Sequence, residues 1–401
     1  MAMDIDPPLD QVGPAVEDYA DCIGTITDYC TRWKSLSLCH IIPSVMKQFH
    51  RLSSKNLPLL EAFRDVGAPF NWPPSFDQSQ TTFLQIVGNA PSLCKLQITI
   101  RAVTDFDPPI QWRQLRVLHI QVHFTLSDCV SLAQQVVESC PVLLECIISF
   151  FLTIHNQHQP SSALAQRKEW KHLRKLGISF SGGVDQTFYS TVFNIFESIT
   201  TPVLTHLSLS SRTYSANDFE NVYPRDNDLP FHNLIMRSQC PLKSLDLYIP
   251  FGAGLEQTLN GLASLTTLSL SSPAWDPFSG TNEHIPSHLD PVLQTLMSSE
   301  GSAPYPHIER LIFRRYPPQQ AFALVDLIES RARSTRLRSF TVDFGDVFSN
   351  KTSNLVKSAL ESVESKQLDV RIEWNHRKPI PIGLDGPHIH VPQEDIDRFV
   401  L

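Results

Sequence analysis

A short apolar motif recurs along most of the chain, and it limits the folds that the chain can adopt. Each copy has an apolar residue, two variable residues, a second apolar residue, one variable residue and a third apolar residue. The second apolar positions between Leu96 and Val370 lie 22 to 43 residues apart, with more than half of the intervals near 30. Nine copies fit well, at residues 93–98, 115–120, 143–148, 173–178, 204–209, 242–247, 265–270, 308–313 and 337–342. Weaker copies occupy 33–38, 60–65 and 367–372.

Each copy predicts a short β-strand, because apolar residues that alternate with variable ones give a strand with one buried face. Several repeats then change from helix to strand at a proline, which cannot continue a helix and restricts the residue before it. These junctions are Ala90-Pro91, Cys140-Pro141, Thr201-Pro202 and Cys240-Pro241. Segments with helical periodicity precede many of the copies, at 82–90, 127–139, 187–199, 254–262, 289–297, 321–331 and 354–363.

One strand and one helix cannot bury an apolar face alone, so the repeats must stack. Stacking joins the strands into a parallel sheet, with the helices along its other side. Neighbouring strands lie about 4.8 Å apart, whereas neighbouring helices need a spacing of about 10 Å. The stack therefore has to curve, with the strands on its inner side. The predicted fold is an α/β solenoid, a horseshoe with a parallel sheet on the concave side and helices on the convex side. We expect it over residues 32–375, with a partly disordered N-terminal segment over 1–31 and a C-terminal cap or tail over 376–401.

Composition narrows the functions open to such a chain. The 401 residues carry a formal net charge of −8 and no run of five like charges. Nucleic acid is therefore not expected as a partner, because binding phosphates needs clustered Lys and Arg. No stretch approaches the roughly 18 apolar residues of a membrane helix, and the acidic N-terminus has no apolar signal segment. The eight cysteines are scattered, which predicts reduced thiols. We expect a cytoplasmic or nuclear protein with no membrane partner.

Three segments resemble the leucine-rich-repeat-like region of F-box proteins, particularly the large fungal sets of them. The Cys-Pro junctions at Cys140 and Cys240 are similar to the cysteine-containing class of leucine-rich repeat found there. Arg32-Trp33-Lys-Ser-Leu36-Ser-Leu38 is similar to the Arg-Trp segment that opens this region, and Leu57-Pro-Leu-Leu60-Glu-Ala-Phe63 is like its next strand. The resemblance covers about residues 32 to 375. It implies a leucine-rich-repeat-like solenoid that recognises the protein or peptide substrate of a ubiquitin ligase.

The F-box itself, a small helical module, precedes this region in the family. Residues 1–31 contain Pro7-Pro8, Gly13-Pro14 and several acidic residues, and no three-helix pattern. The family's adaptor-binding role is therefore assigned to no residue here, and a ubiquitin-ligase adaptor is expected only if an F-box lies upstream. The chain is then either a fragment or a relative without the module. The alternative is a free-standing scaffold or inhibitor-type repeat protein unrelated to ubiquitin.

Alternation places the variable strand residues on the concave face, where a partner would bind. These positions mix both charges with Ser and Thr, which suits a specific protein or peptide better than a polyanion. The alternative is that they are merely solvated strand positions. The candidate partner-binding residues are Lys95, Gln97, His119, Gln121, Lys175, His206, Asp246, Tyr248, Arg310, Arg314, Asp343 and Arg371.

Long aromatic-containing insertions are a second candidate surface, and the alternative is that their aromatic residues fold back and cover the edge of the stack. They lie at 70–74, 212–228 and 272–288, and covering the edge of the stack is the favoured role of their aromatic residues. The close histidine pairs, His155 with His158 and His388 with His390, lack further ligands at zinc-site spacing, so no metal is expected. No catalytic or nucleotide-binding motif is present, which predicts a protein that is not an enzyme and takes no cofactor.

Overall fold

The computed structural model describes a little under half of the chain. The described residues are 24–39, 49, 52, 57–66, 86–100, 111–124, 126–152, 167–181, 193–212, 230–248, 254–271, 293–294, 296–297, 305–314, 316, 321–334, 337–343 and 369–373. The chain divides into two compact units. The first comprises Met1–Ile120 and Leu384–Leu401, and the second comprises Gln121–Gly383.

The fold is a mixed α/β arrangement built on a large parallel sheet. Strand order follows chain order, β1-β2-β3-β4-β5-β7-β9-β10-β11-β12-β13-β14, and no pairing among the described strands closes the sheet into a barrel. The strands are β1 (Ser35–Cys39), β2 (Ala62–Val66), β3 (Lys95–Ile100), β4 (Val117–Phe124), β5 (Glu145–Leu152), β7 (Lys175–Ser181), β9 (His206–Arg212), β10 (Ser244–Tyr248), β11 (Thr267–Ser271), β12 (Arg310–Arg314), β13 (Ser339–Asp343) and β14 (Asp369–Glu373). Each overlaps one copy of the motif, so the predicted strands and their parallel pairing are confirmed.

The apolar residues of the motif face one side of the sheet in register. Leu245 of β10 pairs with Leu207 of β9 and with Leu268 of β11, and all three side chains are buried. The third apolar positions pair in the same way, as Leu247 does with Leu270. Burial of these two rows supplies the main stabilisation of the sheet, at about 1.5–3 kcal/mol for each fully buried Leu, Ile or Phe.

A repeated hydrogen-bond pattern sets where each strand begins. The amides of two consecutive residues donate to one carbonyl in the preceding repeat, as Thr205 and His206 do to the Arg174 oxygen, at 2.9 and 3.0 Å. Lys243 and Ser244 donate likewise to the Thr205 oxygen. We call this pattern the shared-acceptor ladder. Its acceptors are Lys34, Glu61 and Cys94 in the first unit and Leu144, Arg174, Thr205, Lys243, Thr266 and Glu309 in the second.

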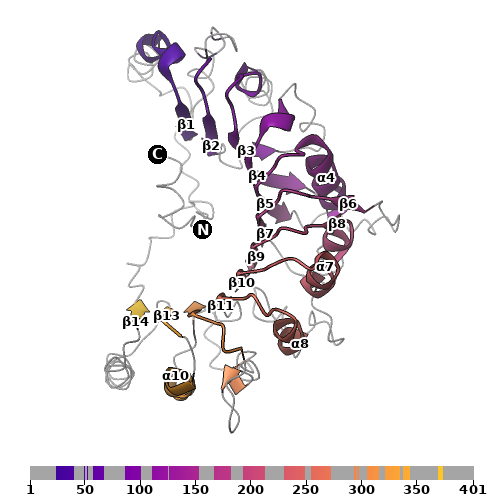
Figure 1. Cartoon of the computed structure of the whole chain (residues 1–401). Helices are drawn as coiled ribbons and strands as arrows, with labels where there is room; N and C mark the ends of the chain where they lie inside the picture. The colour runs from indigo at the N-terminus through magenta and orange to yellow at the C-terminus, as the bar shows by residue number, and fades with distance from the viewer. Residues whose placement is uncertain are drawn as a thin grey trace, which may run out of the picture. The chain divides into compact units, whose positions relative to one another are not determined.

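Helices of the second unit cover the apolar side of its strands, and Figure 1 shows α4, α7 and α8 on that side. The helices are α4 (Leu126–Ser139), α7 (Pro230–Ser238), α8 (Gly254–Asn260) and α10 (Ala321–Ser334). Each buries residues at helical spacing, such as Leu132 and Val136 on α4 and Leu324 and Ile328 on α10. None of the described helices combines the length and the apolar character that crossing a membrane requires.

The helices at 127–139 and 321–331 are confirmed, and the one at 254–262 is confirmed with its end at Asn260. Of the segments 82–90 and 289–297, only residues 86–88, 293–294 and 296 are described as helical. The segment 354–363 lies outside the described residues.

The sequence interpretation was wrong about the end of one helix. The segment 187–199 was expected to stay helical to Ile199, but the described helix ends at Glu197. Ile199–Thr200 instead forms β8, which pairs with β6 (Lys168–Glu169) in a separate two-stranded parallel sheet. The β-branched run Ile199-Thr200-Thr201 before Pro202 explains the change, because such residues favour extended backbone.

Helix α7 was not predicted at all. Its signals are present in the sequence: Pro230 at the first helical position, followed by Phe231, Leu234 and Ile235 at helical spacing. All three apolar side chains are buried.

The cysteines at the Cys-Pro junctions are buried packing residues. Cys140 and Cys240 are free thiols, and the backbone amide of Leu143 closes a turn on the Cys140 carbonyl at 3.2 Å. Desolvation by burial raises the pKa of Cys140 from its ordinary value of 9.0 to about 12 and that of Cys240 to about 11. A thiolate at either position would be a buried charge, and at Cys240 the desolvation outweighs a backbone hydrogen bond that favours the thiolate.

These raised pKa values predict a stability that falls in alkali. A thiol with a raised folded-state pKa binds its proton more tightly when folded, so its contribution is complete below pH 9 and is lost as pH rises toward 11–12. At pH 10 each thiol should cost about 1 kcal/mol of unfolding free energy. Denaturant unfolding at pH 8 and pH 10 should therefore show a smaller drop for the double variant Cys140→Ala/Cys240→Ala than for the unmodified chain. Equal drops would contradict the prediction.

Candidate protein-binding face

The variable strand residues lie on the side of the sheet opposite its buried apolar rows, and we call this side the variable face. In the second unit, strand register arranges them in three rows. The first row is Glu145, Lys175, His206, Ser244, Thr267, Arg310, Ser339 and Asp369. The middle row is Ile147, Gly177, Ser208, Asp246, Ser269, Ile312, Thr341 and Arg371. The third row includes Ser149, Ser179, Ser210, Tyr248, Ser271, Arg314 and Asp343.

Ten of the twelve candidate partner-binding residues are half-buried or exposed. Nine candidates belong to the second unit, and Lys95, Gln97 and His119 belong to the first. Gln97 and His119 are only 5% and 8% exposed, so these two candidates offer little surface to a partner. Neighbouring strands only about 4.8 Å apart bury a middle-row side chain between its neighbours, as Arg64 lies in register with Gln97.

Strands β5 and β7 carry polar groups that satisfy one another across the face. The Lys175 Nζ lies 3.0 Å from the Glu145 Oε1 of its register partner, and the Ser179 hydroxyl donates to the Ser149 Oγ at 2.8 Å. Between these pairs stands Gly177, where an added Cβ would meet Ile147 Cγ1 at 3.2 Å. A larger residue at position 177 would therefore press against the Ile147 side chain, and the polar groups on this part of the variable face are paired with one another.

Strands β10, β11 and β12 carry a different arrangement. The Asp246 Oδ2 and the Arg314 Nη1 lie 3.8 Å apart, too far for a hydrogen bond. Between them on β11, Ser269 and Ser271 are 3% and 0% exposed, and neither hydroxyl has a hydrogen-bond partner. The alternation that places Asp246 on the variable face also places Glu145 and Ser271 there, and neither of these is among the twelve predicted partner-binding residues. Only the packing of their neighbours reveals that the serines are buried.

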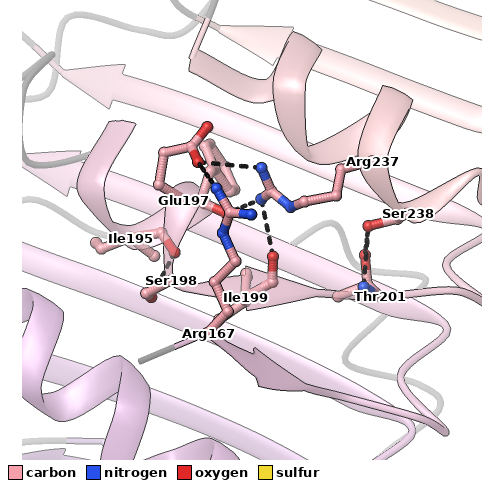
Figure 2. Close-up of polar contacts among 9 residues, drawn as sticks. Arg167, Ile195, Glu197, Ser198, Ile199, Thr201, Arg237 and Ser238 are labelled. Carbon is pink, nitrogen blue, oxygen red and sulfur yellow. Dashed lines mark hydrogen bonds and ion pairs between the residues drawn. The ribbon is translucent and has the colours of Figure 1, made fainter. Parts of the chain in front are cut away.

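A second polar cluster lies on the helical side of the second unit, and Figure 2 shows its contacts. The Arg237 Nη2 on α7 donates to the carbonyls of Phe196 and Ile199, at 2.6 and 2.9 Å. Its Nη1 lies 3.1 Å from the Glu197 Oε2, which also accepts from the Arg167 Nη2. Arg237 thus holds the end of the preceding helix, where backbone carbonyls lack helical partners.

Arg331 on α10 makes similar contacts three repeats further along the chain. Its Nε donates to the Leu296 carbonyl at 2.7 Å and its Nη1 to the Tyr305 carbonyl at 3.2 Å. Desolvation lowers the pKa of this buried guanidinium to about 10, although the nearby Tyr305 opposes that shift. Both arginines join neighbouring repeats through main-chain oxygens, so we assign them a structural role.

Other candidate features of the sequence lie beyond the described residues. These are the histidine pairs at 155/158 and 388/390 and the insertions at 70–74, 213–228 and 272–288. Within the part of the chain that the structure describes, no group of three or more His, Cys, Asp or Glu residues could hold a metal ion. The variable face is the remaining candidate for a functional site.

In comparisons with known proteins, no protein-family model matches the chain, and no curated protein matches its sequence.

We call the contacts of Arg237 with the Phe196 and Ile199 carbonyls and with Glu197 the Arg237 clamp. Its removal should lower the stability of the fold. Arg237→Met keeps the apolar stem but leaves the carbonyls of Phe196 and Ile199 without this donor and Glu197 with only the exposed Arg167, which should lower the unfolding free energy by about 2 kcal/mol. Arg167→Met is the matched control: it removes an exposed contact with the same Glu197 and should cost less than about 0.5 kcal/mol. Denaturant unfolding of both variants measures the difference, and equal losses would contradict the assignment of Arg237 as the clamp.

Proposed function

We propose that the chain is a leucine-rich-repeat-like solenoid that binds another protein through its variable face. On this proposal it is the substrate-recognition region of an F-box-type ubiquitin-ligase receptor, and it works in the cytoplasm or nucleus. Transfer chemistry would belong to other subunits. The observation that carries the proposal is the shared-acceptor ladder, which repeats one strand-to-strand step at nearly every motif copy.

The ladder supports a solenoid because each step uses only the preceding repeat. Lys243 accepts from Thr266 and Thr267, and Thr266 in turn accepts from Glu309 and Arg310. In a chain built from such steps each repeat contacts only its neighbours, as in repeat proteins. The helical clamps by Arg237 and Arg331 link successive repeats on the opposite side.

The chemistry of the variable face supports a protein partner. Its described charges alternate in sign, as in Lys175 beside Glu145 and Arg314 near Asp246, and serine hydroxyls lie between them. A polyanion would be repelled by every second charge, whereas a folded or extended protein segment can match both signs. Presenting side chains from many strands at fixed spacing is how repeat proteins form extended binding surfaces.

The link to ubiquitin rests on the resemblance of the Cys140 and Cys240 junctions and of the Arg32-Trp33 segment. The competing proposal is a free-standing scaffold or inhibitor-type repeat protein. The two differ in the fate of the partner, because a ubiquitin-ligase substrate is degraded after binding and a scaffold partner is not.

Site-specific photocrosslinking in cells tests the proposal. A benzoylphenylalanine residue replaces Ser208 or Thr267 on the variable face, and Glu256, exposed on α8, serves as the control position. We expect both face positions to crosslink to the same protein and the α8 position not to do so. Crosslinks from α8 alone, or from all three positions equally, would contradict binding by the variable face.

Proteasome inhibition then separates the two proposals for the crosslinked partner. A substrate of a ubiquitin ligase should accumulate severalfold, and it should carry ubiquitin when a chain with an upstream F-box is present. A partner whose abundance does not change on inhibition would favour the scaffold.

A further inference from the structure

Two buried hydroxyls on the variable face have no protein partner. The Ser269 and Ser271 side chains of β11 are 3% and 0% exposed, and their Oγ atoms make no hydrogen bond. The residues that alternate with them, Leu268 and Leu270, are buried on the apolar side, so both serines point to the variable face. Buried polar groups are nearly always hydrogen-bonded, so two unsatisfied hydroxyls on one strand need an explanation.

An ion pair crosses β11 above these serines. Strand register places Asp246 of β10 beside Ser269, and Arg314 of β12 beside Ser271. Because β10 and β12 flank β11, the side chains of Asp246 and Arg314 can approach to 3.8 Å only by reaching over it. We call these four residues the β11 patch.

The ion pair of the β11 patch is open, in contrast to the one between β5 and β7. Its nitrogen and oxygen lie 3.8 Å apart, against 3.0 Å for Lys175 and Glu145. The Asp246 and Arg314 side chains are still 30% and 45% exposed, so a group from solution can reach both. Four polar side chains thus converge with their hydrogen-bonding capacity largely unused.

The charges of the patch select the kind of group that fits. A carboxylate or phosphate would bind Arg314 but meet the Asp246 carboxylate, and an ammonium or guanidinium would bind Asp246 but meet Arg314. A neutral group that donates to Asp246 and accepts from Arg314 matches both. The serine hydroxyls lie beneath the Asp246–Arg314 pair and have almost no exposed surface, so a group reaches them only by inserting between these two side chains. There they can donate or accept and so complete its hydrogen bonds.

The side-chain amide of Asn or Gln is such a group. Its C=O and one N–H lie side by side and can bind a neighbouring donor and acceptor together. In a trans peptide bond the N–H and C=O point in opposite directions, so main chain alone matches the patch less well.

We propose that the β11 patch is a subsite for the Asn or Gln side chain of an extended partner segment. This inference rests on the proposed function, because it assigns a chemical preference to one part of the variable face.

Selection from a displayed library of random twelve-residue peptides against the full chain tests the subsite. We expect the selected peptides to share an Asn or Gln at one position, and replacement of that residue by Leu to weaken binding by about tenfold or more. The double variant Ser269→Ala/Ser271→Ala should lose the preference while its melting temperature stays the same or rises, because neither hydroxyl has a partner to lose.

Two charge variants sharpen the test. Asp246→Asn leaves a net positive patch and should shift the preference from Gln to Glu, and Arg314→Met leaves a net negative patch and should shift it to Lys. The matched control is the double variant Glu145→Gln/Lys175→Met, which removes the closed ion pair outside the patch and should leave the preference unchanged.

Three outcomes would overturn the inference: no enrichment of Asn or Gln, enrichment that survives the Asp246 and Arg314 variants, or displacement of the peptides by a twelve-nucleotide oligo(dA). The last would assign the patch to a nucleobase, whose edge also pairs a donor with an acceptor. The proposed function is judged separately by the crosslinks from positions 208 and 267. If these persist in the Asp246→Asn and Arg314→Met variants while no amide preference is found, the subsite fails and the protein-binding face stands.

Discussion

The structure depends on one backbone interaction, the donation of two consecutive amides to a single carbonyl of the preceding repeat. This contact fixes where each strand begins, and therefore which residues face the apolar side and which face outward. A slip of one residue would exchange the two faces of a strand and bury Asp246 where Leu245 or Leu247 now lies. The apolar rows and the shared-acceptor ladder therefore specify the same register.

The strands could be predicted because alternation is a local property of the sequence. The Leu265, Leu268 and Leu270 pattern identifies β11 without reference to any other segment. The β6–β8 pairing could not be predicted in this way, since it joins segments about 30 residues apart and uses only two residues in each. Helix α7 had usable signals, but it follows a long insertion that hid its relation to the repeat.

Burial on the variable face was the least predictable property. Alternation gives the direction of Gln97, Ser149 and Ser269, but all three are buried because residues of neighbouring strands lie against them. The same crowding has two consequences in the second unit. Strands β5 and β7 satisfy their polar groups by a short ion pair and a serine–serine hydrogen bond, whereas β10 to β12 leave two hydroxyls unsatisfied beneath an open pair. A surface that differs in this way along its length is suited to selective binding.

The distance between two spin labels in the second unit tests the parallel stack of strands most directly. Residues 174 and 338 precede β7 and β13, five strand steps apart in the sheet order, so their backbones should lie within about 24 Å. Labels introduced as noncanonical residues avoid the native cysteines, and pulsed electron–electron resonance measures their separation. A single narrow distribution within about 10 Å of that value is the result that the parallel stack predicts. A separation beyond about 40 Å, or a distribution spread over the whole measurable range, would contradict it.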